Sequence, residues 1–336
     1  GNNKSKEELV LAITNNIGAI VVDNFYELEL VNSVAISKSK MANIMLRITP
    51  GIECHTHDYI KTGQVDSKFG FDLSQLPEAL ELVTRRYRNL SLQGFHAHIG
   101  SQIFDLDSYA DLAKIILELY AHYQKEYRVK FTKLNIGGGF GIKYTNQDDP
   151  PEISQVADVI TKAVKKNCTN LGLNLPLLLL EPGRSLIGPA GITLYQIGSH
   201  KEVPNVRKYI AIDGGMADNP RPAMYNAKYS ACIANKMLQK EKEIVTVAGR
   251  FCESGDILIK DIELAKSSSG DLLAVFATGA YNYSMSSNYN MVPRPACVIV
   301  KDGNADVIIE RETYQDMVSK HRVPSRFIKS KNVPQE

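Results

Sequence analysis

Residues that could perform acid–base and anion-binding chemistry follow a short apolar run near the middle of the sequence. Residues 177–180 are four consecutive leucines. They are followed by Glu181, a Pro182-Gly183 turn and Arg184. A carboxylate at a strand end can keep a heterocyclic nitrogen protonated, and a nearby arginine can bind a carboxylate or phosphate as a fork. We expect a strand buried on both faces that ends at Glu181, where parallel α/β folds place their chemistry. A surface turn with a structural ion pair would give the same short pattern.

Three consecutive glycines, Gly137, Gly138 and Gly139, follow another predicted strand. Glycine lets the backbone approach a ligand closely and lets several N–H groups point at one anion, so this segment is a candidate phosphate cradle. Ser101, which follows the predicted strand at residues 94–98, could add a hydroxyl to the same phosphate. An ordinary tight turn would also explain the glycines.

Two histidines occupy alternate positions of the predicted strand 94–98. Because strand side chains alternate with period two, His96 and His98 should point to one face of the sheet. His98 is closer to the strand end, so we expect it to be the ligand-contacting residue of the two. Either could instead be a core histidine whose hydrogen bonds are satisfied inside the protein.

Further polar groups occur in the second half of the sequence. They are Asp213-Gly214-Gly215 with Arg221 and Tyr225, Cys252 beside Glu253 and Asp256, and Tyr281, which opens a segment rich in aromatic residues and amides. The first group could bind an anion, and the second places a thiol next to two acids. A surface loop would explain each group singly, but their occurrence in one chain favours a functional site.

The elements that must position these residues alternate between strand and helix in the first part of the chain. We predict strands at residues 20–22, 44–48, 94–98, 131–136 and 177–180, with helices between them. This order is typical of a (β/α) barrel or a doubly wound sheet. A barrel closes with eight strands, so we expect the first three strands to precede Gly1.

Local signals predict several element boundaries. Ser5 and Glu8 have the spacing of a capping box at the start of a helix, and Asp107 should cap a later helix. Residues 51–73, which include His55 and His57, should form a long polar loop that is functional or mobile.

The pattern changes after about residue 189. Short β-branched runs separated by turns predict strands at residues 192–197, 208–212, 243–248, 257–260, 272–278, 296–301 and 305–309. Such spacing is typical of a β-sandwich or small β-barrel. We therefore expect a (β/α) barrel domain at residues 1–188 and a C-terminal β-domain at residues 189–336, with a loose basic tail after Val323.

Composition narrows the class of function. The formal net charge is +2, from 39 Lys and Arg against 37 Asp and Glu. This small charge gives no electrostatic field that would attract nucleic acid or an anionic membrane. The five cysteines are scattered without a CxxC pair, which argues against disulfides and a zinc site, so we expect no metal. A reducing compartment, the cytoplasm, is the expected location.

Seven short motifs together resemble one known family. They are HIGSQ at 98–102, NIGGGFG at 135–141, EPGRS at 181–185, DGGM at 213–216, RPAMY at 221–225, CESGD at 252–256 and GAYNYSMSSNYN at 279–290. In this order they resemble the pyridoxal-phosphate decarboxylases of the alanine-racemase-like type (fold type III), and most closely the branch that acts on diaminopimelate. The resemblance covers essentially the whole chain. It implies a (β/α)8 TIM-like barrel, a C-terminal β-domain and a homodimer with shared active sites.

The resemblance also implies a role for each motif residue. His98 would stack on the cofactor ring, Glu181 would pair with its nitrogen, and the Pro182-Gly183 turn would bring Arg184 between cofactor and substrate. The cofactor phosphate would be held by Ser101, Gly137, Gly138, Gly139 and Tyr281. Substrate would be bound by Arg184, Arg221, Tyr225, Tyr281 and Glu253, and Cys252 of the other subunit would donate a proton. The implied reaction is decarboxylation of meso-2,6-diaminopimelate to L-lysine.

One part of the family pattern is absent from these residues. The family attaches its cofactor through a lysine in a YAVKAN-like motif, which this sequence does not contain, and Lys4 matches a different loop. The missing segment could lie upstream, could have been removed, or the chain could be a non-catalytic regulatory relative. A sister enzyme acting on ornithine, arginine or carboxynorspermidine is the other alternative.

Overall fold

A parallel β-sheet organises the first part of the chain in the computed structural model, which describes residues 1–51 and 67–328. Its strands, in spatial order, are β1 (Ile20–Val22), β2 (Ala42–Thr49), β4 (Leu90–His96), β5 (Lys133–Asn135) and β6 (Leu177–Leu179). The short β3 (Phe71–Asp72) pairs with β2 beside this path. Every pairing in the sheet is parallel, as the alternating sequence pattern predicted for a barrel wall.

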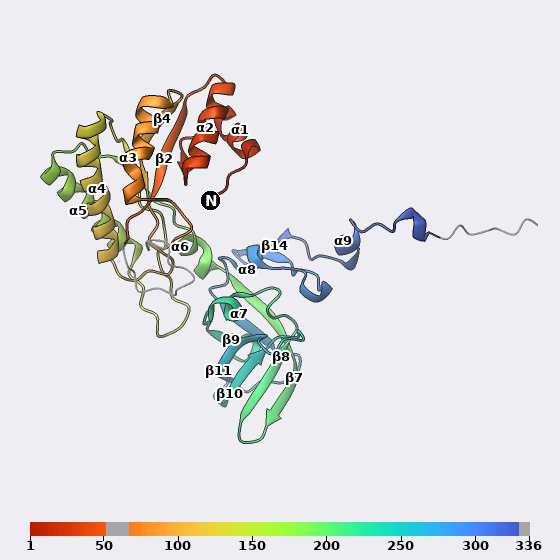
Figure 1. Ribbon diagram of the computed structural model, residues 1–336. Coiled ribbons are helices and arrows are strands. Elements are labelled where there is room, and N and C mark those ends of the chain that lie inside the picture. Colours follow the sequence, from red (N-terminus) through yellow and green to blue (C-terminus); the bar gives the residue numbers. More distant parts are fainter. Residues whose placement is uncertain (52–66, 329–336) are drawn as a thin grey trace, which may run out of the picture. The chain divides into compact units, whose positions relative to one another are not determined.

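Helices connect the strands of this sheet (Figure 1). They are α1 (Lys6–Thr14), α2 (Phe25–Ser37), α3 (Leu76–Glu81) with a π-helical turn at Leu82–Arg86, α4 (Asp107–Tyr127), α5 (Ile153–Leu171) and α6 (Arg184–Ile187), with single turns at Leu73–Gln75 and Gly188–Ala190. The chain forms two compact units, Gly1–Ala190 and Gly191–Glu336. Within the described residues, no helix is both long enough and apolar enough to cross a bilayer.

Some local predictions are confirmed and others are corrected. The capping box of Ser5 and Glu8 is present at the start of α1. Asp107 is not a cap: the N-cap of α4 is Leu106, and the Asp105 carboxylate accepts a hydrogen bond from the Asp107 N–H. The Asp105 carboxylate therefore accepts one of the free N–H groups at the start of α4, which is the role that we predicted for Asp107.

The predicted loop at residues 51–73 ends earlier than expected, because its last residues form β3 and a helical turn. His55, His57 and the other residues at 52–66 lie outside the described residues. The strand predicted at 94–98 begins at Leu90 and ends at His96, so His98 lies beyond it and does not share a strand face with His96.

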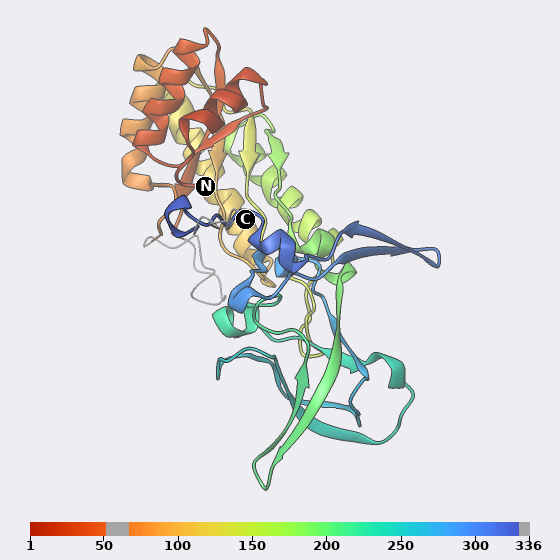
Figure 2. The same cartoon turned by 90° about the vertical axis from the view of Figure 1, so that its right-hand side faces the viewer.

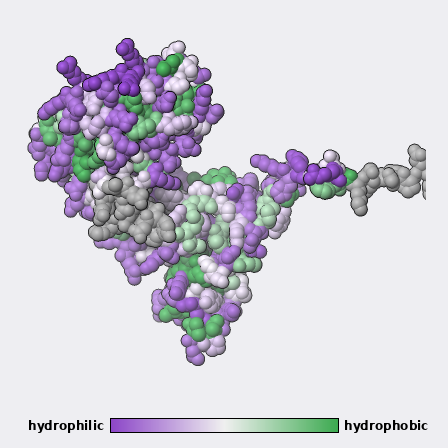
Figure 3. Space-filling view, in the orientation of Figure 1, coloured by the Kyte–Doolittle hydropathy of each residue, from purple (hydrophilic) through white to green (hydrophobic). Residues whose placement is uncertain are grey.

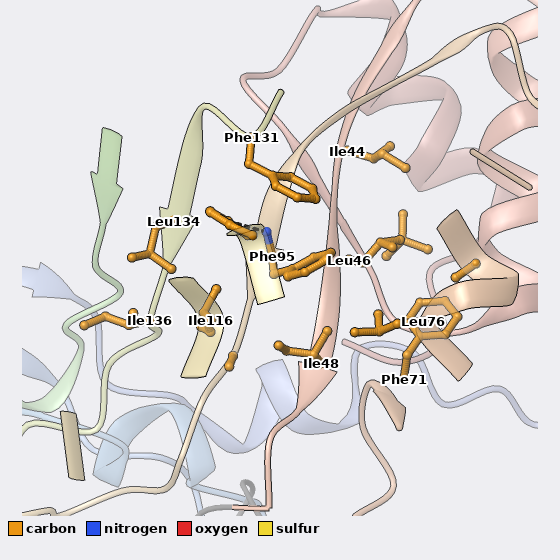
Figure 4. Close-up of a cluster of buried hydrophobic side chains, with 14 of the residues drawn as sticks. Ile44, Leu46, Ile48, Phe71, Leu76, Phe95, Ile116, Phe131, Leu134 and Ile136 are labelled. Atoms are coloured by element: carbon orange, nitrogen blue, oxygen red, sulfur yellow. Dashed lines mark hydrogen bonds between the residues drawn. The ribbon is translucent and has the colours of Figure 1, made fainter. Parts of the chain in front are cut away.

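The core of the first unit centres on Phe95, which lies on β4. Its ring is 5.3 Å from that of Tyr120 and 5.0 Å from that of Phe131, centroid to centroid, and Figure 4 shows it among aliphatic side chains of β2 and β5. Apolar residues on α4 at helical spacing complete this cluster, as their periodicity predicted. Figure 3 shows that hydrophilic residues predominate on the visible face of this unit.

A tyrosine hydroxyl joins two strands inside this core. The Tyr120 hydroxyl accepts a hydrogen bond from the Phe95 N–H at 2.8 Å and donates one to the Lys133 carbonyl at 2.5 Å. Burial raises the pKa of Tyr120 above its ordinary value, so the hydroxyl keeps its proton. A Cβ on Gly94 would lie 1.9 Å from the Lys133 carbonyl oxygen and 2.5 Å from the Tyr120 hydroxyl. Only glycine fits there.

The prediction that residues 177–180 form a strand buried on both faces is wrong. Leu177 is 60% exposed and Leu180 is 38% exposed. β6 is the last strand of the sheet and, within the described residues, pairs only with β5. One neighbouring strand covers less of its surface than two would. A short apolar run indicates a strand but not whether that strand is central.

The second unit is a β-domain, as predicted. Figure 2 shows β7 and β8 as a long hairpin within it. Its six-stranded sheet has the order β11 (Ile257–Ala265), β10 (Lys242–Ala248), β8 (Arg207–Ile212), β7 (Ile192–Val203), β12 (Leu272–Phe276) and β9 (Ala231–Ile233). The end strands β11 and β9 also contact each other, so the sheet curls toward a barrel. A separate hairpin consists of β13 (Cys297–Lys301) and β14 (Asn304–Ile309).

Sequence analysis missed β9, a three-residue strand that is too short for an alternating pattern to stand out. The helices of this unit are α7 (Arg221–Tyr225), α8 (Asn282–Met285) and α9 (Tyr314–Val318), with single turns at Ala234–Lys236, Tyr289–Met291 and Ser325–Phe327.

Candidate active site

A row of polar side chains crosses the carboxyl ends of the parallel strands. The register pairs Arg47 of β2 with His96 of β4, and His96 with Asn135 of β5. Because partners in a parallel sheet point to the same face, these three side chains lie side by side. His96 and Asn135 are 3% and 5% exposed. Asp23, which follows β1, extends the row: its carboxylate lies 3.9 Å from the Arg47 guanidinium.

Glu181 receives two hydrogen bonds from this row. The Asn135 amide donates to one carboxylate oxygen at 2.8 Å, and His96 Nε2 lies 3.3 Å from the other. The backbone N–H of Glu181 donates to the Gly137 carbonyl at 2.7 Å. The side chain remains 49% exposed, so the carboxylate is held on one side and open on the other.

These contacts set the protonation states of the site. The hydrogen bond with His96, supported by Asn135, lowers the pKa of Glu181 to about 2. Burial lowers the pKa of His98 to about 4, and the positive charge of Arg47 adds to this effect. Near neutral pH the site therefore holds an ionised carboxylate beside a neutral imidazole.

The glycine segment packs too closely for side chains. A Cβ on Gly138 would lie 2.1 Å from the Glu181 carbonyl oxygen, and one on Gly139 would lie 2.2 Å from the Gly100 carbonyl oxygen. Gly137 has φ +70°, a left-handed conformation that favours glycine. The Ile103 N–H donates to the Gly139 carbonyl, so the segment after β4 lies beside the glycines.

Arg184 is brought to the same end of the sheet. It begins α6, directly after the Pro182-Gly183 turn, and is 7% exposed. Its guanidinium donates to the Ser101 hydroxyl at 2.8 Å and to the Tyr144 hydroxyl at 2.5 Å. The structure thus places Ser101 and Arg184 in one hydrogen-bonded group.

The second unit contains its own cluster around Arg221. The guanidinium donates to the Tyr229 hydroxyl at 2.6 Å and lies 5.4 Å from the Tyr281 ring centroid. Arg221 is 8% exposed, whereas Tyr281 is 42% exposed and has φ +72°, unusual for a residue other than glycine. Tyr225 lies at the other end of α7, partly buried.

Cys252 and Glu253 lie on an exposed loop of the second unit. The Tyr289 hydroxyl donates to the Glu253 carboxylate, and this bond raises the pKa of Tyr289. The base of the loop is held by Asp256, whose buried carboxylate accepts from the Met216 N–H at 2.8 Å and the Phe251 N–H at 2.9 Å. Asp256 therefore ties the Cys252 loop to the segment 213–216.

Sequence analysis missed four residues of these clusters. Arg47, Asn135, Tyr144 and Tyr229 were assigned no role, and His96 was considered less suited to ligand contact than His98. Asn135 stands two residues before the glycines, and Arg47 interrupts an apolar strand, so both positions carried a signal. Nothing in the sequence pointed to Tyr144, which is 40 residues from its partner Arg184.

Comparison with known families and proteins gives a consistent result. The family described as "pyridoxal-dependent decarboxylase, pyridoxal binding domain" matches residues 1–188. Among curated proteins, a diaminopimelate decarboxylase of Bacillus subtilis (strain 168) is 51% identical over 320 residues, which are 95% of this chain and 73% of that protein. One from Synechocystis is 49% identical over 98% of this chain and 69% of that protein.

Solved structures show the same likeness. The diaminopimelate decarboxylase of M. jannaschii in complex with L-lysine has a TM-score of 0.90 at 37% identity, covering 98% of this chain and 74% of that one. The Helicobacter pylori diaminopimelate decarboxylase in complex with L-lysine has a TM-score of 0.85 at 30% identity. The match covers 95% of this chain and 77% of that one. A lysine/ornithine decarboxylase from Vibrio vulnificus shares the fold. Its TM-score is 0.70 at 23% identity, and the match covers 86% of this chain and 71% of that one.

Proposed function

The chain belongs to the pyridoxal-dependent decarboxylases, and from this membership we infer that it decarboxylates meso-2,6-diaminopimelate to L-lysine. The observation that carries this substrate is the identity of 49–52% with curated diaminopimelate decarboxylases over at least 93% of the chain. The lysine/ornithine enzyme is much more distant in sequence, at 23% identity, which disfavours the ornithine alternative. The reaction is the lysine-forming step of amino-acid biosynthesis.

The residues of the first unit fit pyridoxal phosphate. The glycine segment packs closely against the backbone of Glu181 and Gly100 and carries no side chains, and such a glycine backbone can approach a phosphate closely. The open side of the Glu181 carboxylate, ionised near neutral pH, suits a ring nitrogen. Ser101 and Arg184 supply a hydroxyl and a guanidinium at the same end of the sheet. The cofactor, when bound, delocalises the charge left by the departing carbon dioxide if its ring nitrogen is protonated.

Each residue of the first unit then has a defined task. Glu181 holds a proton on the ring nitrogen through its negative charge. His98, neutral near pH 7, packs its flat ring on the cofactor without adding positive charge. Ser101 and the glycines would bind the phosphate, and Arg184 would lie between cofactor and substrate.

The second unit supplies groups for the substrate. Arg221 and Tyr225 bind the distal carboxylate, and Tyr281 contacts phosphate and substrate. Cys252 gives a proton to the carbon that lost carbon dioxide, and Glu253 pairs with the distal ammonium. We propose that Cys252 and Glu253 serve the site of the partner subunit, that the enzyme is a homodimer, and that it works in the cytoplasm.

Substrate comparison tests this function. Purified full-length protein with pyridoxal phosphate should release carbon dioxide from meso-2,6-diaminopimelate much faster than from ornithine, arginine or carboxynorspermidine. Activity on ornithine alone would overturn the substrate assignment, and no activity on any of these amino acids would favour a regulatory relative. Glu181→Ala should reduce turnover sharply while the far-ultraviolet circular dichroism spectrum stays unchanged, because the side chain is half exposed.

A further inference from the structure

Two buried residues hold the Glu181 carboxylate from behind. Asn135 binds one of its oxygens at 2.8 Å, and His96 Nε2 lies 3.3 Å from the other. An ionised carboxylate only accepts hydrogen bonds, so His96 must carry its proton on Nε2 in this contact. Each oxygen therefore has one fixed donor, and the remaining acceptor positions face the open side.

Asn135 is itself held in one orientation. Its amide oxygen accepts a hydrogen bond from the Gly137 N–H at 2.9 Å, which leaves the amide nitrogen to face Glu181. The Glu181 N–H in turn donates to the Gly137 carbonyl at 2.7 Å. Glu181 is thus tied through backbone and side chain to the start of the glycine segment.

The sheet register explains why these donors are rigid. His96 is the last residue of β4 and Asn135 the last of β5, and the two are direct partners in the parallel ladder. Both side chains are more than nine-tenths buried. The Nδ1 atom of His96 is buried with no hydrogen-bond partner among the described residues, so the contact with Glu181 is the polar interaction that orients this ring.

We propose that His96 and Asn135 are positioning residues for the cofactor-binding carboxylate. They fix the direction of the Glu181 carboxylate, and Asn135 couples its position to the candidate phosphate-binding glycines. This inference rests on the proposed function for the role of Glu181, but the hydrogen bonds concern this chain alone. The charged or titratable groups near the carboxylate are His96, His98 and Arg47.

The test measures Glu181 directly in the protein before cofactor is added. Carboxyl carbons labelled with 13C are titrated by NMR, and Glu181→Gln identifies the signal. In the wild type Glu181 should titrate near pH 2. In His96→Leu its pKa should rise by roughly one unit or more, because a hydrogen bond to the charged form is lost. His96→Gln keeps an N–H donor and should restore a low value.

Asn135 is tested in the same way. Asn135→Leu removes both hydrogen bonds, so the pKa of Glu181 should rise and pyridoxal phosphate should bind roughly 10-fold more weakly or worse. Binding is followed by equilibrium dialysis with free pyridoxal phosphate. His122→Leu, on the exposed face of α4, is the control and should change neither quantity. Thermal unfolding confirms that each variant is folded; a variant that does not fold is replaced by Asn135→Ser or His96→Phe, and His96→Phe also lacks the N–H donor.

The outcomes separate this inference from the proposed function. If Glu181 titrates in folded His96→Leu and Asn135→Leu as in the wild type, the positioning role is overturned. If both variants shift its pKa while the wild type fails to decarboxylate meso-2,6-diaminopimelate, the positioning role holds and the substrate assignment fails. A shift in the leucine variants that His96→Gln reverses supports the proposal.

Discussion

The Arg184 guanidinium donates a hydrogen bond to the Ser101 hydroxyl at 2.8 Å, although the two residues are 83 positions apart in the chain. Ser101 follows β4, and Arg184 begins the short helix after β6. The contact therefore connects two loops at the carboxyl ends of strands that are not neighbours in the sheet. Its formation therefore depends on the position of β5, the strand between them.

Arg184→Lys should lower kcat/KM because an ammonium cannot reproduce a planar fork that reaches both Ser101 and Tyr144. We expect a loss of roughly 10- to 100-fold, since a hydrogen bond to a charged group contributes about 1.5–3 kcal/mol. Steady-state kinetics measure the effect. Tyr144→Phe removes one of the two hydrogen-bond partners of Arg184, so it should lower kcat/KM less than Arg184→Lys does. Equal kcat/KM in wild type and Arg184→Lys would contradict the arrangement.

His98 should be neutral throughout the range from pH 5.5 to 8, because burial lowers its pKa from 6.5 to about 4. The unfolded chain gains a proton on this residue as the pH falls below 6.5, whereas the folded chain does so only near 4. As the pH falls from 6.5 to about 4, His98 therefore lowers the free energy of unfolding. Urea unfolding at pH 7.5 and 5 should show a smaller decrease in His98→Gln. An equal decrease in both proteins would show that His98 titrates normally.

Gly138→Ala should destabilise the protein by about 1–3 kcal/mol, because its Cβ would lie 2.1 Å from the backbone carbonyl oxygen of Glu181 and one segment must move. Gly18→Ala is the matched control in the same unit, since its Cβ would meet nothing within 4 Å. Denaturant unfolding of the two variants gives the comparison. Similar stability for both would mean that the segment tolerates a side chain.

Asp256→Ala should destabilise the second unit, because the partly buried Met216 N–H and the buried Phe251 N–H would lose their acceptor. Each unpaired buried donor costs about 1–3 kcal/mol. Asp306→Ala, which removes an exposed carboxylate from β14, should have little effect. Differential scanning calorimetry compares the two variants. Faster reaction of Cys252 with a thiol reagent in Asp256→Ala would show that the loop has loosened.

The sequence allowed the fold to be predicted well where local signals were strong. The capping box at Ser5 and the five parallel strands were found because each depends on residues close together in the chain. The burial of β6 could not be inferred, since it depends on how many strands lie beside it. The corrected position of His98, beyond β4, shows the usual uncertainty of one or two residues at a strand end.

The candidate site was predictable only in part. Motifs singled out Glu181, Arg184 and the glycines as candidates. The partners Asn135 and Tyr144 lie 46 and 40 positions from the residues they bind, and amides and phenols occur in many roles. Their contribution follows from strand register and loop packing, which a single sequence does not reveal.

The absence of a side chain at Gly94 limits how this protein can be redesigned. Its Cα lies two residues before His96 on β4, at the level where the Tyr120 hydroxyl bridges to β5. A methyl group there would push β4 away from β5, and the same displacement would separate His96 from Asn135 at the strand ends. A side chain at Gly94, a position that carries no reactive group, would therefore also disturb the hydrogen bonds that hold the Glu181 carboxylate.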